Sequence, residues 1–379
     1  MKHVLSEVAD VTMGQSPKSE YYNSEGHGMP FLQGNRTFGK RYPVFDTYTT
    51  MPTKIARAGD VIMSVRAPVG DLNYTPVDMC LGRGVCGIRM KNGNQDFLFY
   101  LLKYYMPQLL NKESGTVFGS VNRNDINGLE IDIPDDVNVQ KRISRVLAML
   151  DEKIGKNDAI NDNLLLQSLC IYSEMIGSSK DGCIGDYCSI KSGFAFKSKW
   201  WQDSGVPVIK IGSINQDYLN LSDCSYVSED KISLANDFIV VGGDLLIAMT
   251  GATIGKFAMV PKVSETILVN QRVGKFFLGD NPISRLPFIY CTLKQPEVVS
   301  EVINRGQGSA QPNISASDIM SIPCVIPSAK VIDEFNKSTS QMFELIINNQ
   351  YENAVLANTR DSILPKLMSG ELDVSELNL

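Results

Sequence analysis

The sequence is poor in residues that build metal sites and acid–base sites. Histidine occurs only twice in 379 residues, at His3 and His27. The eight cysteines include no Cys-x-x-Cys pair, so the pattern disfavours a zinc site or a disulfide framework and indicates reduced, structural thiols. These cysteines are Cys80, Cys86, Cys170, Cys183, Cys188, Cys224, Cys291 and Cys324.

Long hydrophobic runs are also missing. Residues 1–14 carry acidic and polar side chains where a signal peptide requires an apolar core. No uncharged apolar stretch approaches the roughly 18 to 20 residues that span a membrane. We therefore expect a cytoplasmic protein. Hydrophobic residues at 43% and charged residues at 21% are typical of globular chains, and 379 residues suffice for two or three compact units.

Complete catalytic motifs are absent as well. Residues 82–87 fit Gly-x-Gly-x-x-Gly, but no helix pattern follows that could receive a pyrophosphate. Residues 251–257 resemble a phosphate-binding loop, yet they are one residue short between the glycines and have Phe257 where Ser or Thr must bind magnesium. Asp135, Asp151 and Lys153 loosely match a nuclease set, but solvated helix charges explain them better. No Asn/Asp-Pro-Pro-Tyr motif of amino-methyltransferases occurs. The chain is therefore predicted to perform no chemistry itself.

An internal repeat is present instead. Four blocks recur in the same order, including a Gly-Asp turn before an apolar run and a closing block that aligns without gaps. The paired blocks are 5–14 with 184–193, 28–33 with 205–210, 58–65 with 242–249, and 115–134 with 308–327. Two related globular segments are therefore predicted.

A long helix is predicted after each globular segment. Apolar residues follow helical spacing over 137–176 and again over 331–364, where Pro365 is expected to end or kink the second helix. Each apolar stripe is interrupted by amides, which either fix register on a seam or, for most of them, lie in solvent. The six amides are Asn157, Asn161, Asn163, Asn348, Asn349 and Gln350.

The predicted order is globule, helix, globule, helix. The segments are 1–134, 135–177, 178–328 and 329–379. If the second helix returns toward the first globule, the helices pack antiparallel as a coiled coil with approximate two-fold symmetry. The predicted fold class is α+β, with two pseudo-symmetric α/β domains joined by two long antiparallel helices.

Charge is distributed unevenly along these segments. The formal net charge is −6, although affinity for nucleic acid normally depends on Lys and Arg. Residues 1–134 hold 14 basic and 13 acidic residues, and 178–328 hold 13 and 14. Most of the excess acid therefore lies outside the globular segments, which are free to carry local basic faces. We expect a partner to supply further positive charge.

Polar, glycine-containing loops of both globules carry the residue types that contact DNA. Arg, Asn and Gln can read base edges bidentately, while Lys suits phosphate, although any one of these residues is more often an ordinary exposed loop residue than a base contact. The adjacent Trp200 and Trp201 are expected to be one core and one surface residue. The DNA-binding candidates are Gln33, Asn35, Arg36, Lys40, Arg41, Arg66, Asn122, Arg123, Lys197, Lys199, Lys210, Thr250, Lys256, Gln271, Arg272, Arg305, Gln307, Gln311 and Asn313.

The repeat, the two helices and residues 362–372 together resemble the specificity subunits of Type I restriction-modification systems. Residues 243–256 and 308–319 resemble that family's target-recognition pattern closely. The resemblance implies that each globule is a target recognition domain for one half of a split, asymmetric DNA site, and that the helices set the gap. It also implies two modification subunits that carry S-adenosylmethionine, and a motor-nuclease subunit for cleavage. The first domain departs from the pattern at Arg66 and at Phe118-Gly119, so its loop contacts follow less directly.

Two other interpretations stay open on the sequence. A self-contained DNA methyltransferase would bind a methyl donor by itself, which the missing motif disfavours. A structural coiled-coil adaptor would retain no DNA selectively, even with its partners present. The target bases cannot be derived from the sequence, because loops on a common scaffold determine them.

Overall fold

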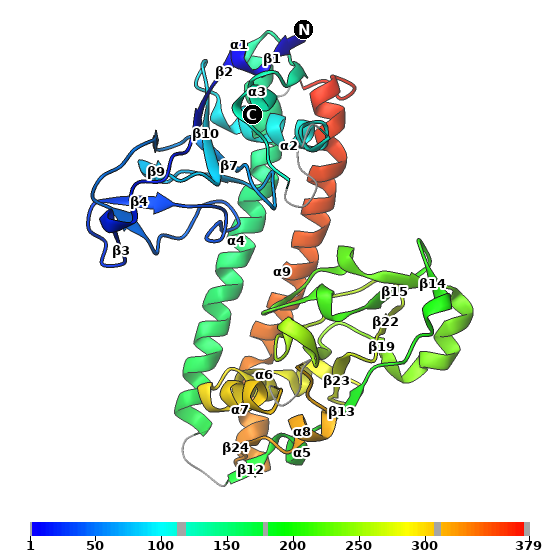
Figure 1. Ribbon diagram of the computed structural model, residues 1–379. Helices are drawn as coiled ribbons and strands as arrows, with labels where there is room; N and C mark the ends of the chain where they lie inside the picture. Colours follow the sequence, from blue (N-terminus) through cyan, green and yellow to red (C-terminus); the bar gives the residue numbers. More distant parts are fainter. Residues whose placement is uncertain (1, 112–118, 177–180, 307–311, 375–379) are drawn as a thin grey trace. The chain divides into compact units, whose positions relative to one another are not determined.

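The computed structural model describes residues 2–111, 119–176, 181–306 and 312–374 and divides the chain into two compact units. Unit 1 comprises residues 1–152 and 357–379, and unit 2 comprises residues 153–356. Both divisions fall inside the long helices α4 (Val137–Ile176) and α9 (Ala329–Ser369), which Figure 1 shows in green and in orange to red. Each unit therefore combines one globule with a segment of both helices, and the predicted four-segment boundaries stay a prediction.

The described residues of unit 1 form three sheets. A two-stranded sheet pairs β1 (Lys2–Val4) with β11 (Glu130–Asp132). The antiparallel four-stranded sheet has the order β2 (Ala9–Met13), β10 (Val85–Met90), β7 (Val61–Ser64), β8 (Leu72–Tyr74). The five-stranded sheet has the order β3 (Tyr22–Asn23), β5 (Tyr48–Thr49), β4 (Met29–Leu32), β9 (Met79–Leu81), β6 (Ile55–Ala56). The helices of this globule are α1 (Leu5–Val8), η1 (Ser19–Tyr21), α2 (Gln95–Leu110) and α3 (Arg123–Asn127).

Unit 2 repeats this arrangement of strands. A two-stranded sheet pairs β12 (Asp181–Cys183) with β24 (Pro323–Val325). The four-stranded order is β13 (Ser189–Ser192), β23 (Val273–Phe277), β20 (Leu245–Ala248), β21 (Phe257–Met259). The five-stranded order is β14 (Trp201–Gln202), β18 (Ser225–Val227), β15 (Val206–Ile209), β22 (Ile267–Val269), β19 (Ile239–Val240). A hairpin of β16 (Ile214–Asn215) and β17 (Tyr218–Leu219) is added to the repeat.

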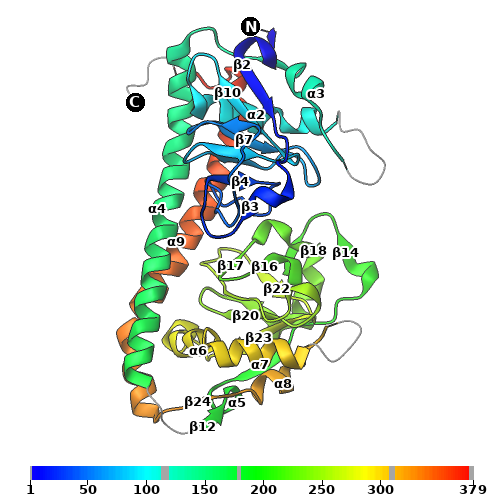
Figure 2. The same cartoon turned by 60° about the vertical axis from the view of Figure 1, so that its left-hand side comes forward.

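Helical elements of unit 2 are more numerous but follow the same order. The α-helices are α5 (Ile184–Tyr187), α6 (Leu286–Leu293), α7 (Pro296–Gly306) and α8 (Ala316–Met320). The 3-10 turns are η2 (Ser198–Trp200), η3 (Ile211–Ser213), η4 (Leu221–Asp223), η5 (Glu229–Phe238), η6 (Gly251–Thr253) and η7 (Pro282–Ser284). In Figure 2, α6 and α7 lie on one side of β23 and β20.

The repeat predicted from sequence blocks is confirmed by strand order and by matching contacts. Arg66 forms an isolated antiparallel bridge with Ser120, and Thr250 forms the same bridge with Asn313. The closing blocks align Ser120 with Asn313, and Arg66 and Thr250 directly follow the aligned blocks 58–65 and 242–249. The predicted fold class, two related α/β globules with two long helices, is therefore correct.

Central strands of each globule are apolar on both faces because both faces are covered. Val61 and Met63 of β7 belong to the core that includes α2, whereas Ile62 belongs to a second core with Leu32 and Leu81. In β20, alternate residues divide in the same way between two cores. Successive side chains of a strand point to opposite faces, so a short, continuous apolar run is what such a doubly covered strand requires.

The first long helix has the predicted bounds, but the second does not end at Pro365. Helix α9 continues through Pro365 to Ser369, and Gly370 follows with φ +77°, a conformation that glycine adopts without strain at a helix end. Leu364, Leu367 and Met368 are buried in the core of unit 1. Their burial offsets the hydrogen bond that proline removes.

The two helices run antiparallel within unit 2, and their seam contains the amides. Asn157 Nδ2 donates to Asn353 Oδ1 at 2.9 Å, and Asn349 Nδ2 donates to Asn161 Oδ1 at 2.8 Å, so residue numbers rise on one helix as they fall on the other. The expectation that most of the six amides lie in solvent is wrong. Asn157, Asn161 and Asn349 are buried and Gln350 is half-buried, because each has a hydrogen-bonding partner. Asn163 and Asn348 are exposed.

Buried thiols contribute to the hydrophobic cores of both units. All eight cysteines are free, and five of them are buried. Burial raises the pKa of Cys86 to about 12 and that of Cys291 to about 12, so these thiols stay protonated near neutral pH. Within the described residues, no helix is long and apolar enough to cross a membrane. The same residues contain no group of three or more His, Cys, Asp or Glu side chains that could hold a metal ion.

Candidate nucleic-acid interface

Several chain segments of unit 1 meet just beyond the end of β7. Backbone hydrogen bonds join Val65 N to Gly84 O at 2.9 Å, Gly84 N to Gln33 O at 3.0 Å, and Val121 N to Val65 O at 3.1 Å. We call this region the first loop edge and define it as residues 33–36, Arg66, residues 82–84 and Ser120. It borders a hollow of about 400 Å³ that Gln33, Asn35, Arg36, Arg66 and Gly84 help to line.

Four of the predicted DNA-binding residues therefore come together at the first loop edge. Arg66 is exposed. The other three already have intramolecular contacts: Arg36 forms an ion pair with Asp46 at 2.6 Å, and Asn35 Nδ2 donates to Asp71 Oδ2 at 2.5 Å. Gln33 Oε1 accepts a hydrogen bond from Ser16 at 2.9 Å. Hydrogen bonds from Arg36 and Thr47 lower the pKa of the Asp46 carboxyl, so it is ionised near neutral pH.

Arg41 is separated from this group. The loop that carries it runs along β8, where buried Asn73 bonds to Gly39 and Tyr74 N donates to Arg41 O. The Arg41 guanidinium lies 5.0 Å from the Tyr74 ring centroid and 3.7 Å from Asp96. Together with residues 59, 75 and 92–96 it lines a different hollow of about 670 Å³. Lys40, in the same loop, is exposed.

Asn122 is used to start a helix. Its Oδ1 accepts from Asn124 N at 2.8 Å and from Asp125 N at 3.1 Å, while Asn122 N donates to Asp125 Oδ2. This capping box satisfies the free N–H groups at the start of α3. Arg123, the first residue of α3, is exposed.

An equivalent second loop edge exists in unit 2, which we define as Lys210, Thr250, residues 270–272 and Asn313. Asn270 N donates to Ile209 O at 3.0 Å, Met249 N to Arg272 O at 3.0 Å, and Ile314 N to Met249 O at 2.9 Å. The first bond repeats that from Gly82 N to Leu32 O in unit 1, and the other two repeat those that join Val65 to Gly84 and Val121 to Val65. Gln271, Arg272 and Asn313 are exposed, and Lys210 and Thr250 are half-buried.

Aromatic rings beside this edge carry lysines on their faces. Lys210 Nζ lies 3.6 Å from the Trp201 ring centroid, and Lys197 Nζ lies 5.3 Å from that of Trp200. Burial lowers the pKa of Lys210. Both tryptophans are half-buried, so the expectation of one core and one surface residue is wrong. The reason is that Trp200 stacks on Phe194 at 6.4 Å while Trp201 packs on Phe196 at 5.5 Å. Lys199 is exposed in the same segment.

The remaining predicted residues of unit 2 lie elsewhere. Lys256 is half-buried and lines a hollow of about 170 Å³ with Val302 and Ile303 of α7. Arg305 forms an ion pair with Glu301 at 3.0 Å and donates to Ser321 Oγ at 2.6 Å and to a backbone carbonyl, so its guanidinium supports the local fold. Gln307 and Gln311 lie outside the described residues.

Sequence reasoning missed two cations of these regions. Arg83 is exposed at the first loop edge, at the position that Gln271 occupies in the second. The structure aligns the two positions, because residues 82–84 follow β9 as residues 270–272 follow β22, but no aligned sequence block covers either segment. Lys231 Nζ lies 4.9 Å from the Trp200 ring centroid and comes from η5, a segment that no aligned block covers.

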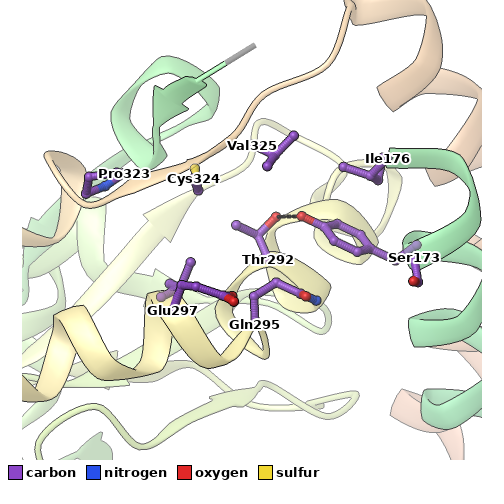
Figure 3. Close-up of a pocket in the computed structure, with 10 residues that line it drawn as sticks. Ser173, Ile176, Thr292, Gln295, Glu297, Pro323, Cys324 and Val325 are labelled. Atoms are coloured by element: carbon purple, nitrogen blue, oxygen red, sulfur yellow. Dashed lines mark hydrogen bonds between the residues drawn. The ribbon is translucent and has the colours of Figure 1, made fainter. Parts of the chain in front are cut away.

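A larger hollow of unit 2 has different chemistry. It encloses about 520 Å³ between α4, α6, α7 and β24. A hydrogen bond 3.0 Å long joins Tyr172 to Thr292, and Figure 3 shows Thr292 with Cys324 and Val325 across the space. Of its ten lining residues only Glu297 is charged. Phosphate contacts require cations, so this hollow does not fit a nucleic acid.

The two loop edges, by contrast, present guanidinium, amide and ammonium groups on glycine-containing turns next to rigid strands. Such groups can donate to base edges and phosphates, but they include no nucleophile with an adjacent base. The arrangement fits recognition of a polar, anionic polymer.

Comparison with known proteins identifies relatives for the whole repeat. A family model described as "Type I restriction modification DNA specificity domain" matches residues 2–165 and again residues 178–353. A putative type I restriction enzyme MjaX specificity subunit of Methanocaldococcus jannaschii is 41% identical over 146 residues, which are 38% of this chain and 34% of that protein. The MjaIX specificity subunit of the same organism is 22% identical and covers 98% of this chain and 93% of its own length.

A solved structure shares the fold. The crystal structure of a Type-I restriction-modification system S subunit from M. genitalium aligns with a TM-score of 0.57 and 18% identity, over 97% of this chain and 95% of that one. At this identity the likeness concerns the fold alone.

Proposed function

The chain belongs to the family of Type I restriction-modification DNA specificity domains, and from this premise we propose that it is the sequence-reading subunit of such a system. Each loop edge contacts one half of a bipartite, asymmetric DNA site. The chain itself catalyses nothing. Two modification subunits supply S-adenosylmethionine and the methyl-transfer site, and a motor-nuclease subunit joins them for cleavage.

The observation that supports this proposal is that the same backbone arrangement occurs twice in the chain and carries different side chains each time. Matched backbone positions hold different residues: Gln33 opposite Lys210, Arg66 opposite Thr250, Arg83 opposite Gln271, and Ser120 opposite Asn313. One scaffold that presents two sets of hydrogen-bonding groups is what an asymmetric bipartite target requires. A symmetric target would call for matching sets.

Because the two globules are nearly neutral, the partner subunits must supply most of the positive charge that contacts phosphates. Binding that depends on few cations is weak at physiological salt, because each phosphate contact contributes through counterion release. We therefore propose that the modification subunits provide most phosphate contacts, while the loop edges supply discrimination. Helices α4 and α9, of 40 and 41 residues, would set the spacing between the half-sites.

Exchange of one globule tests the division of labour. Residues 1–134 are replaced by the first domain of another family member, the complex is assembled with its modification subunits, and methylated sites are mapped by long-read sequencing. We expect one half-site to change while the other half-site and the gap stay the same. The reciprocal exchange of residues 178–328 is the matched control. Simultaneous change of both halves, or methylation without any sequence preference in the unexchanged complex, would contradict the proposal.

A further inference from the structure

The turn at residues 82–84 is held rigidly at the first loop edge. Gly82 N donates to Leu32 O at 2.7 Å, Gly84 N donates to Gln33 O at 3.0 Å, and Gly84 O accepts from Val65 N at 2.9 Å. Arg83 N donates to Ser16 Oγ at 3.2 Å. Since the backbone of the turn is bonded to three other segments, the scaffold fixes the direction of the Cα–Cβ bond of its one side chain.

Both flanking positions admit only glycine. A Cβ atom at Gly82 would lie 2.7 Å from Gln33 Cα, and one at Gly84 would lie 2.6 Å from Gln33 O. Contacts this short with backbone atoms cannot be relieved by a side-chain rotation. The close backbone crossing therefore leaves Arg83 as the single side chain at the tip of the turn.

Arg83 differs in its partners from Arg36 and Arg89 of the same unit. Arg36 is paired with Asp46 at 2.6 Å, and Arg89 with Asp60 at 2.5 Å. Across residues 2–111, 119–176, 181–306 and 312–374, no carboxylate forms an ion pair with Arg83, and its side chain is exposed. A guanidinium carries five donors in a planar fork, which matches the O6 and N7 acceptors of guanine in the major groove.

We propose that Arg83 is a specificity-determining residue that donates bidentately to a guanine in the half-site contacted by unit 1. This inference rests on the proposed function and adds the residue and the base. Backbone preorganisation is the physical reason: a rigid turn gives up little backbone freedom on binding, and the planar guanidinium fork loses less freedom per hydrogen bond than a lysine would.

The test uses the full chain assembled with its modification subunits. Methylation rates are measured on the mapped target and on duplexes that change one base pair of the first half-site at a time. For Arg83→Ala we expect discrimination to fall by roughly 10- to 100-fold at a single G·C position, with the second half-site read as before. Arg57→Ala is the matched control, since Arg57 is an exposed arginine of the same unit at the opposite end of β7, and it should leave discrimination unchanged.

Other outcomes overturn the inference in distinguishable ways. A uniform loss of rate on every duplex that Arg83→Lys restores would identify a phosphate contact instead. Unchanged discrimination in Arg83→Ala, with amide exchange showing a folded unit 1, would remove Arg83 from recognition. Absence of sequence preference in the unsubstituted complex would overturn the proposed function itself.

Discussion

The two units share one strand order, yet their globules are anchored to the helix segments in different ways. In unit 1, Tyr100 of α2 donates to Asp151 Oδ2 of α4 at 2.7 Å, and Arg360 of α9 pairs with the same carboxylate. Lys103 of α2 pairs with Asp361 of α9 at 2.9 Å. The globular helix of unit 1 is therefore bonded directly to both long helices.

In unit 2 an inserted turn supplies the charged anchor, beside direct hydrogen bonds of α6: Thr292 bonds to Tyr172 of α4 at 3.0 Å, and Phe288 N donates to Asn336 Oδ1 of α9 at 2.9 Å. Tyr290 of α6 and Lys294, the residue that follows α6, both bind the Asp217 carboxylate, at 2.5 and 2.5 Å. Asp217 lies in the turn of the β16–β17 hairpin, and its backbone carbonyl accepts a hydrogen bond from Gln350 Nε2 of α9 at 3.1 Å. The hairpin thus adds a charged link between α6 and α9 to these direct bonds.

Both units keep a lysine at the same position of the repeat, but the carboxylate that pairs with it comes from a different element in each unit. Lys103 follows Leu102 and lies six residues after Phe97, and Lys294 has the same relation to Leu293 and Phe288. In unit 1 the carboxylate comes from the long helix, and in unit 2 it comes from the added hairpin. Substitutions at matched positions should therefore have unequal effects in the two units.

The largest difference between the units in the loss of unfolding free energy is expected at the two Gly-Asp turns. Asp60 pairs with Arg89 at 2.5 Å and Asp244 with Lys275 at 2.9 Å, but the Arg89 side chain is 41% exposed and that of Lys275 only 11%. Burial raises the pKa of both Asp60 and Asp244. Lys275→Ala leaves a buried carboxylate without its cation and should lower the free energy of unfolding of unit 2 by about 3 to 5 kcal/mol.

Arg89→Ala is the matched substitution in unit 1. It removes a partly solvated partner, so we expect a loss of about 1 kcal/mol. Urea unfolding of the full chain, followed by amide exchange that resolves each unit, measures both losses. Equal losses in the two units would show that the exposure of the cation does not determine the effect.

A smaller difference in stability loss is expected at the carboxylates that pair with the two anchoring lysines, Asp217 and Asp361. Asp217 has φ +72°, a conformation that Asn tolerates, so Asp217→Asn keeps the turn and removes the charge. Weakening the charged hydrogen bonds from Tyr290 and Lys294 should destabilise unit 2 by about 1 to 2 kcal/mol.

Asp361→Asn is the control in unit 1. Although burial opposes it, hydrogen bonds from Arg360 and Lys103 hold the pKa of Asp361 below its usual range. Arg360 keeps Asp151 after this substitution, and the Asp361 side chain is 52% exposed, so the loss should be under about 1 kcal/mol. Amide exchange in α6 and in α2 compares the two variants. A larger loss for Asp361→Asn would reverse the assignment of the stronger anchor.

Repetition in the sequence predicted the scaffold because strands, Gly-Asp turns and apolar stripes are dictated by local spacing. The partners of loop side chains were not predictable in the same way. Arg41 and Arg305 are of a residue type that often contacts DNA. Within the fold, however, Arg41 pairs with Asp96 and Arg305 pairs with Glu301. Charge type identifies a donor but not its acceptor, and the acceptor depends on the path of the loop.

Two further differences have the same origin. Helix α9 continues past Pro365 because tertiary burial outweighs a local rule, which a sequence window does not include. The amides of the seam are buried because the opposite helix supplies partners at matching heights. Arg83 was not predictable from the aligned blocks, because none of them covers residues 82–84 or 270–272, and only the strand order places Arg83 opposite Gln271.

The smallest net effect is expected where two buried amides satisfy each other. In unit 2, Asn349 Nδ2 donates to Asn161 Oδ1 at 2.8 Å, whereas in unit 1 the helix segments meet through the Asp151–Arg360 ion pair. Asn349→Leu alone leaves the Asn161 amide buried without this partner, which should cost about 1 to 3 kcal/mol. Replacing both residues with Leu removes the polar requirement, so the double variant should lie within about 1 kcal/mol of the original chain.

A double-mutant cycle with Asn161→Leu, Asn349→Leu and the pair separates these terms, with the free energy of unfolding of unit 2 as the measured quantity. The coupling should be at least about 1 kcal/mol, and the double variant should be more stable than either single variant. Because a satisfied amide pair restricts register more than it stabilises, its removal should leave stability near its starting value while permitting slippage between α4 and α9. Cysteine cross-linking at Ile154 and Leu356, on the two helices, against a pair displaced by one turn, detects such slippage. Additive single effects with an unchanged cross-linking pattern would mean that this amide pair is not what holds the two helices in register.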